Sequence, residues 1–184
     1  GMRGAGLDRL NPVTGIFSRY QFGSGDDGPD NIYALFQDSA GILWAGCDHG
    51  FTQLYIGKKE ACTYTHDPDN DASVGPPGVR ASAEDAKGSL WVGSAGSGLS
   101  RLVADAGTFQ HFAHSSSDAS TISSNRVASL FRDGAGRLWA GTTHGLNLVD
   151  HVSGDVVRYA HDAADASSLG GNDITTFYED RGGL

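Results

Sequence analysis

Hydrophobic residues in this chain occur in short runs separated by polar, glycine-rich stretches. The third of three similar regions shows this most clearly, with runs at about 127–131, 137–142, 146–150 and 156–160. Short runs bounded by glycine and aspartate are typical of β-strands joined by tight turns. The first two runs are apolar on both faces, as a strand must be when its sheet packs between two others. The pattern predicts an all-β fold of small four-stranded antiparallel sheets.

The pattern returns at a nearly constant interval. Trp44, Trp91 and Trp139 are 47 and 48 residues apart. An aspartate stands six residues before each tryptophan and a glycine two residues after it: Asp38, Asp85 and Asp133, and Gly46, Gly93 and Gly141. Four short strands in a repeat of this length indicate the blades of a β-propeller rather than a helical solenoid. About four such repeats fit into the 184 residues, as a partial propeller or one that a dimer completes.

Each recurring residue has a mechanical reason for its position. The aspartate can accept hydrogen bonds from backbone amides of its own turn, and the glycine three residues later, such as Gly136, can close the hairpin in a left-handed conformation. The tryptophan supplies a large rigid surface that fills the space between blades. The glycine after it allows a neighbouring backbone to approach closely. We therefore assign these residues to the scaffold.

The repeat also sets the expected domain organisation, a single propeller region over residues 1–184. Whole and partial blades are expected at about 31–66, 79–114 and 127–161, and at 4–22 and 174–184 respectively. A strand is predicted at 174–178. Closed propellers have four to eight blades, and an open sheet edge tends to pair with other strands. We therefore expect the region to be part of a longer protein or to close with a second copy.

Charge and hydropathy exclude two classes of partner. The formal net charge is −9 at pH 7, and no run of five basic residues exists. Nucleic acids and anionic membranes both attract basic surfaces, so neither is expected as a partner. No stretch approaches the roughly 18 to 20 apolar residues of a membrane span, and no signal peptide is visible in the chain. Insertion of this chain into a membrane is therefore not expected.

Two cysteines occur in the first whole blade. Cys47 and Cys62 fall on its second and fourth strands, which are not neighbours. Strands two apart lie roughly 9 to 10 Å from each other, too far for a disulfide. Both are predicted to be free, packed thiols.

The third repeat resembles a known family. It runs from Asp133 through Leu138-Trp139 and Gly145-Leu146 to His161-Asp162, followed by Ser168-Leu169. This order of phrases is similar to that of the two-component regulator propeller repeat, and the resemblance extends over nearly the whole chain. It implies a propeller in the periplasmic or extracytoplasmic part of a bacterial sensor kinase or related regulator. It also implies a region that binds or transmits a signal and has neither catalysis nor a cofactor of its own.

Six residues are the candidates for ligand binding. His49 and His144 lie in the loops between the second and third strands of two blades. Those loops and the long loops between blades emerge at the same end of a propeller, which commonly holds the ligand pocket. The remaining candidates at that end are Asp48, Thr143, Arg80 and Arg126. The alternative is that all six are solvated loop residues.

Other chemically suggestive residues have structural explanations. His66, His114 and His161 share one repeat position, which favours bonding to a loop backbone over metal binding. Residues 67–71 alternate carboxylates like a calcium loop, but the Gly and Glu that an EF-hand needs are replaced by Ala72 and Gly78. No metal site is therefore expected. Motifs for a serine nucleophile, a zinc protease or a phosphate loop do not occur.

These observations favour a non-catalytic signal-sensing module of a bacterial two-component system. Its ligand would be a small molecule, with carbohydrate as one class, or a partner protein. The alternative is a scaffold for protein interaction or dimerisation. A propeller lyase is a third reading, which would need an acid–base pair and a metal in one blade.

Overall fold

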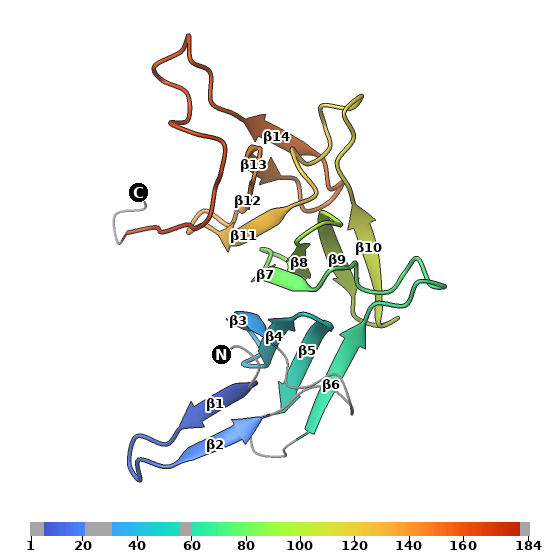
Figure 1. Ribbon diagram of the computed structural model, residues 1–184, viewed down its shortest axis with the longest axis vertical. Coiled ribbons are helices and arrows are strands. Elements are labelled where there is room, and N and C mark those ends of the chain that lie inside the picture. The colour runs from blue at the N-terminus through green and yellow to red at the C-terminus, as the bar shows by residue number, and fades with distance from the viewer. Residues whose placement is uncertain (1–5, 21–30, 56–59, 181–184) are drawn as a thin grey trace.

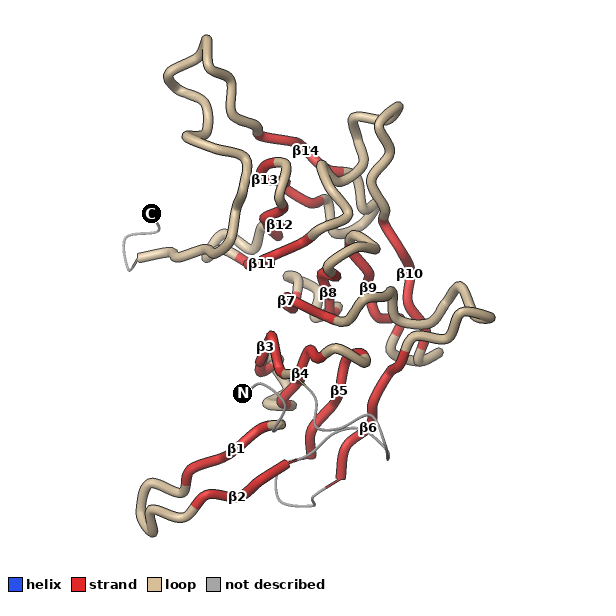
Figure 2. Tube along the Cα trace, viewed as in Figure 1, coloured by secondary structure: helices blue, strands red, loops and turns tan. Residues whose placement is uncertain are grey.

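The computed structural model describes residues 6–20, 31–55 and 60–180, and all regular structure in these ranges is β-strand (Figure 2). The strands form one two-stranded hairpin and three four-stranded antiparallel sheets. The hairpin consists of β1 (Leu7–Leu10) and β2 (Phe17–Tyr20). The first blade consists of β3 (Ile32–Gln37), β4 (Leu43–Cys47), β5 (Gly50–Tyr55) and β6 (Glu60–Thr65). The second consists of β7 (Val79–Glu84), β8 (Leu90–Ser94), β9 (Leu99–Val103) and β10 (Thr108–Phe112). The third consists of β11 (Val127–Arg132), β12 (Leu138–Thr142), β13 (Gly145–Val149) and β14 (Val156–Tyr159).

The three blades follow one another in an arc (Figure 1). Within each blade the strands pair in chain order. The first strands β3, β7 and β11 lie on the inside of the arc, where β7 contacts both β3 and β11, whereas the fourth strands lie outside. We call the surface formed by these three first strands the concave wall. The architecture is that of propeller blades, as the sequence predicted.

Apolar side chains fill the spaces between blades. Trp44 and Phe51 of the first blade pack with Val79 and Val92 of the second. Trp91 of the second blade is fully buried in a similar cluster with residues of the third. Because each cluster draws on two blades, neither blade buries its apolar face alone. The blades therefore stabilise one another.

The turn between the first and second strands has the same construction in all three blades. In the second blade, Oδ1 of Asp85 accepts hydrogen bonds from the amides of Lys87 and Ser89. Its Oδ2 accepts one from the indole nitrogen of Trp91 at 2.9 Å. The corresponding bonds from Trp44 to Asp38 and from Trp139 to Asp133 are both 2.8 Å long. The predicted bonding of this aspartate to its own turn is confirmed, and the bond to tryptophan adds a link that the sequence analysis did not foresee.

This geometry also sets the acidity of the turn aspartate. Burial raises the pKa of Asp85, but the hydrogen bonds from Trp91, Ser89 and Lys87 outweigh it, so that the pKa lies below its usual value. The ionised form is therefore the one that the turn stabilises.

The glycine that follows each tryptophan is crowded by the next part of the chain: Gly93 faces the side chain of Val127, whereas Gly46 and Gly141 face backbone. A Cβ atom on Gly46 would stand 2.7 Å from the carbonyl oxygen of Val79, and one on Gly141 would stand 2.8 Å from that of Ile174. These distances leave no room for a side chain. The predicted close approach at this position is confirmed.

The segment after the third blade differs from its prediction. No strand is assigned at 174–178, although residues up to Glu179 lie against the third blade. Ile174 donates its amide to the carbonyl oxygen of Thr142, and Phe177 stacks on Phe131. These contacts hold the segment in place, but no neighbouring strand among the described residues pairs with its backbone. The predicted strand is therefore wrong for the structure described.

The remaining structural predictions concern cysteine and histidine. Cys47 is buried on β4 as predicted, whereas Cys62 is exposed on β6, so the predicted packing of Cys62 is wrong; neither cysteine forms a disulfide within the described ranges. Nδ1 of each repeated histidine lies within hydrogen-bond distance of a loop carbonyl eight residues ahead: His66 to Val74 at 3.2 Å, His114 to Ile122 at 2.7 Å and His161 to Leu169 at 2.6 Å. Their structural role is confirmed. A helix that could span a membrane is not found in the described ranges.

Candidate functional site

A cavity of about 460 Å³ lies at one end of the concave wall, where the first strands begin. We call it the arginine cavity. Its lining comes from all three blades: Tyr33, Arg80, Ala95, Arg126, Val127, Ala128 and Thr143. Residues as far apart in sequence as Tyr33 and Thr143 therefore surround one space.

Arg80 is held in place by a short chain of contacts. Its guanidinium carbon lies 3.4 Å from the centroid of the Tyr33 ring, a cation–π contact. The Tyr33 hydroxyl donates a hydrogen bond to Asp48 at 2.6 Å, and the side-chain amide of Asn31 donates another at 2.6 Å. Tyr33 thus joins the Arg80 cation to the Asp48 anion without a direct ion pair between them.

The acidity of Asp48 follows from these neighbours. Burial raises the pKa of its carboxyl group, whereas hydrogen bonds from Tyr33 and Asn31 and the charge of Arg80 lower it. The lowering effects prevail, so Asp48 remains ionised near neutral pH. The negative charge of Asp48 therefore partly offsets the positive charge of Arg80 on this side of the cavity.

Arg126 lies across the cavity from this chain of contacts. Its backbone is fixed, because its amide donates to Ser124 Oγ at 3.1 Å and its carbonyl accepts from the amide of Thr143 at 3.3 Å. Its side chain is exposed, and its guanidinium has no hydrogen bond or ion pair within the described ranges. Arg126 therefore contributes the less compensated positive charge.

The structure separates the six predicted binding residues. Arg80, Arg126 and Thr143 line the arginine cavity, and Asp48 stands behind Tyr33. His49 and His144 are exposed and do not line the cavity. Nδ1 of His144 lies 3.1 Å from the hydroxyl of Thr143, so this histidine contacts the lining from outside.

Sequence reasoning missed Tyr33, and the repeat contained a signal for it. Tyr33 is the second residue of β3, and the equivalent residues of β7 and β11 are Arg80 and Ala128. This position therefore differs in every blade, whereas the turn aspartate and tryptophan do not. Divergence at a position that faces the concave wall marks a residue that the scaffold leaves free to vary.

The chemistry of the arginine cavity suits an anionic group. Guanidinium groups bind carboxylate, sulfate or phosphate oxygens through charge-assisted hydrogen bonds. Thr143 adds a hydroxyl group that can donate or accept. No group of three or more His, Cys, Asp and Glu side chains positioned to hold a metal ion occurs in the part of the chain described.

Solved structures with this fold come from several kinds of protein. The extracellular domain of BT3049, described as a hybrid two-component system of B. thetaiotaomicron, superposes with a TM-score of 0.68 at 18% identity over 80% of this chain. PorZ of Porphyromonas gingivalis, a surface component of the type-IX secretion system, gives 0.68 at 17% identity over 98% of the chain. Virginiamycin B lyase of Staphylococcus aureus gives 0.63 at 15% identity over 87%. Identities this low establish a shared fold and nothing more.

The chain corresponds to only part of each of these proteins. It spans 20% of the BT3049 domain, 28% of PorZ and 50% of the lyase. A search among curated protein sequences finds no match.

One family model matches parts of the sequence. The family described as "Two component regulator propeller" matches residues 27–49 and 121–144. These two segments are equivalent parts of different repeats, and each includes the first strand of its blade and the turn aspartate that follows it. Two of the repeats in this chain therefore match the two-component regulator propeller family.

Proposed function

We propose that this chain is a non-catalytic sensing module from the extracytoplasmic part of a bacterial two-component system. We further propose that it binds an anionic small molecule in the arginine cavity. Supporting this, the repeats belong to a regulator family, and a structural neighbour is the extracellular domain of a two-component protein.

One observation carries the proposal. Two arginines from adjacent blades line a single cavity in a chain whose net charge is −9. Most of the surface of such a chain repels anions, so a local pair of guanidinium groups would concentrate them at this cavity. Sugar acids combine a carboxylate with hydroxyl groups and are suitable first probes.

The test is calorimetric titration with D-glucuronate and D-galacturonate, with neutral D-glucose for comparison. We expect a sugar acid to bind, glucose to bind at least about tenfold more weakly, and Arg126→Gln to remove that preference, because one charge-assisted hydrogen bond is worth roughly this much. Lys87→Gln is the matched control, since it removes one exposed positive charge from a turn outside the cavity. Equal binding of acid and neutral sugar, or an acid preference that Arg126→Gln leaves intact, would contradict the proposal.

A second candidate function is a scaffold for dimerisation, which the β1–β2 hairpin favours. Several of its large apolar side chains are exposed, including Val13 at 91%, Ile16 at 65% and Phe17 at 62%. Contiguous exposed apolar residues often mark protein contacts. Sedimentation velocity would detect a concentration-dependent dimer, and Phe17→Ser should weaken it. A monomer at all concentrations would remove this candidate.

A further inference from the structure

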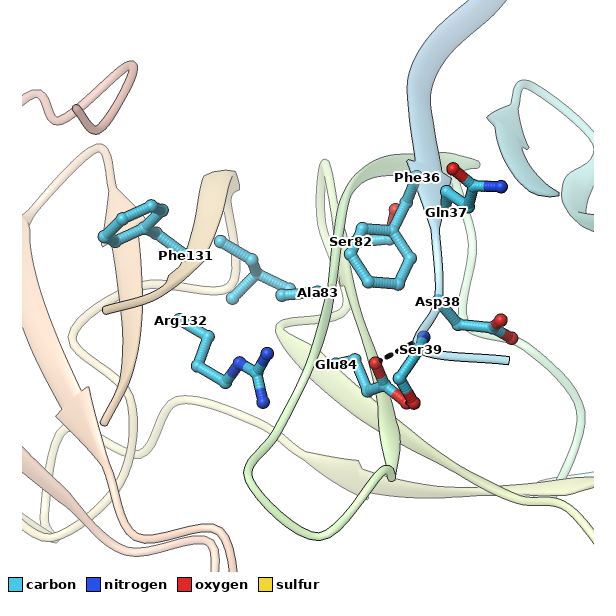
Figure 3. A pocket seen from close by; sticks show the side chains of 10 residues that line it. Phe36, Gln37, Asp38, Ser39, Ser82, Ala83, Glu84, Phe131 and Arg132 are labelled. Atoms are coloured by element: carbon cyan, nitrogen blue, oxygen red, sulfur yellow. Dashed lines mark hydrogen bonds between the residues drawn. The ribbon is translucent and has the colours of Figure 1, made fainter. Parts of the chain in front are cut away.

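A second cavity, of about 360 Å³, lies at the other end of the concave wall, where the first strands end (Figure 3). We call it the notch. Phe36 and Ser82 lie on one side of it, and Phe131 and Arg132 lie on the other. None of its lining residues lines the arginine cavity, so the two sites are separate.

The notch exists because the second blade has small residues where its neighbours have large ones. The fourth and fifth residues of β7 are Ser82 and Ala83. The same positions hold Leu35 and Phe36 in β3, and Leu130 and Phe131 in β11. The equivalence is secure, because the fifth residue pairs with the blade's tryptophan in all three sheets.

The next interface along the arc shows what large residues do at this position. Phe131 stacks on Phe177 with ring centroids 5.7 Å apart and planes inclined by 17°. Two aromatic rings therefore occupy the space between the third blade and the segment after it. At this strand position the second blade has Ala83 and therefore no ring, so the space beside it stays open.

The lining of the notch combines apolar side chains with polar ones, and one of its charged groups is available to a ligand. Phe36 and Leu130 are half-buried, and Ala83 is buried between their blades. Arg132 is exposed, and its guanidinium makes only a long bond of 3.5 Å to the carbonyl oxygen of Asp85 within the described ranges. An anion at the rim could pair with this guanidinium, and only this long hydrogen bond would have to be given up.

The two carboxylates that line the notch, Asp38 and Glu84, already accept hydrogen bonds from the scaffold. The Glu84 carboxylate accepts hydrogen bonds from the amide and hydroxyl of Ser39 at 2.8 and 2.7 Å. Asp38 accepts from Trp44 and from the amide of Ile42. In contrast, the hydroxyl of Ser82 is buried and has no partner among the residues described. Such an unpaired group is uncommon in a native protein.

We propose that the notch is a second ligand site, for a planar aromatic ring that carries an acidic group. The ring fits where the second blade lacks its own, against Phe36 and Leu130 and over Ala83. The acidic group faces Arg132. Aromatic rings gain from contact with one another beyond simple burial, and a guanidinium–carboxylate pair orients the ligand.

The test uses phenylacetate as the probe and neutral phenylacetamide as its match, both measured by ligand-observed NMR titration. We expect phenylacetate to bind about tenfold more tightly than phenylacetamide, and Arg132→Gln to reduce phenylacetate affinity about tenfold without changing that of phenylacetamide. Arg126→Gln, in the other cavity, should change neither.

Filling the notch tests the ring site directly. Ala83→Phe and Ser82→Leu install the residues that neighbouring blades carry at these positions, and each should abolish binding of both probes. Using two fills keeps the test valid if one variant fails to fold. Absence of phenylacetate binding to the unmodified protein, equal affinity for the two probes, or binding that survives in a folded filled variant would overturn the proposal.

Discussion

The first-to-second-strand turns and the concave wall are adjacent parts of every blade, yet they follow opposite rules. The turns repeat the same aspartate–tryptophan bond three times, with distances of 2.8, 2.9 and 2.8 Å. The wall changes from blade to blade, and its second position holds Tyr33, Arg80 or Ala128. A position that closes a turn or fills an interface between blades keeps the same residue type in all three blades. A position on the concave wall has no such requirement and can vary. The comparison therefore distinguishes scaffold residues from candidate binding residues.

The largest effect should come from removing a scaffold tryptophan. Trp91→Ala deletes a fully buried side chain at the interface between the second and third blades and should cost about 3–5 kcal/mol of unfolding free energy. Trp139→Ala is the matched variant and should cost clearly less, because Trp139 is only half-buried. Urea unfolding followed by circular dichroism measures both. Equal losses would show that burial between blades is not what makes the tryptophan important.

The next effect concerns the turn aspartate. Asp85→Ala leaves the indole N–H of Trp91 and the amides of Lys87 and Ser89 without their acceptor, and should cost about 2–3 kcal/mol. Asp85→Asn keeps one acceptor oxygen and should cost less. Urea unfolding would again report the losses. If the alanine variant were no less stable than the asparagine variant, the hydrogen bonds would not be the reason for the repeat.

Acid should weaken the scaffold through the same carboxylates. The pKa values of Asp85 and Asp133 lie below their usual value, since hydrogen bonds outweigh burial at both. A lowered folded-state pKa adds stability above the unfolded pKa of about 4, and this stability is lost as the pH falls through the folded value. The unfolding free energy should therefore change little between pH 7 and pH 5 on this account and fall below about pH 4. Asp85→Asn should flatten that fall; an unchanged acid profile in this variant would contradict the assignment.

The smallest effect on stability should be on the wall. Tyr33→Phe keeps the ring beneath Arg80 but removes the hydroxyl that bonds to Asp48, and should cost about 1 kcal/mol or less. Thermal unfolding would measure this loss, and glucuronate titration would show whether Arg80 is still positioned. If Tyr33→Phe lowered the unfolding free energy as much as Asp85→Ala, Tyr33 would be a scaffold residue, and the distinction between the turns and the concave wall would fail.

Whether the sequence predicted a residue's role correctly depended on whether that residue recurs in each repeat. The sequence predicted the strands of the third blade, the turn aspartate and the glycine that lies close to the next part of the chain. These features could be predicted because the same residues recur at the same positions in three repeats. The strand expected at 174–178 was not correct, since a strand needs a partner and the local pattern says nothing of one. For the arginine cavity, Arg80, Arg126 and Thr143 were found from loop placement, whereas Tyr33 was missed because an aromatic residue in a strand is indistinguishable from core. The candidates His49 and His144 share the right end of the blades but lie outside the cavity.

Sequence patterns alone specify the blade, namely its four strands, its turns and the residues at which neighbouring blades touch. Local hydrophobic periodicity and turn chemistry act over a few residues, so they are legible along the chain. Which residues of the concave wall meet became clear from the arrangement of the blades in space. Arg80 and Arg126 line one cavity, and Ser82 and Ala83 open another between larger neighbours, because the blades are stacked side by side. Such a juxtaposition depends on distances between blades, which no single repeat encodes.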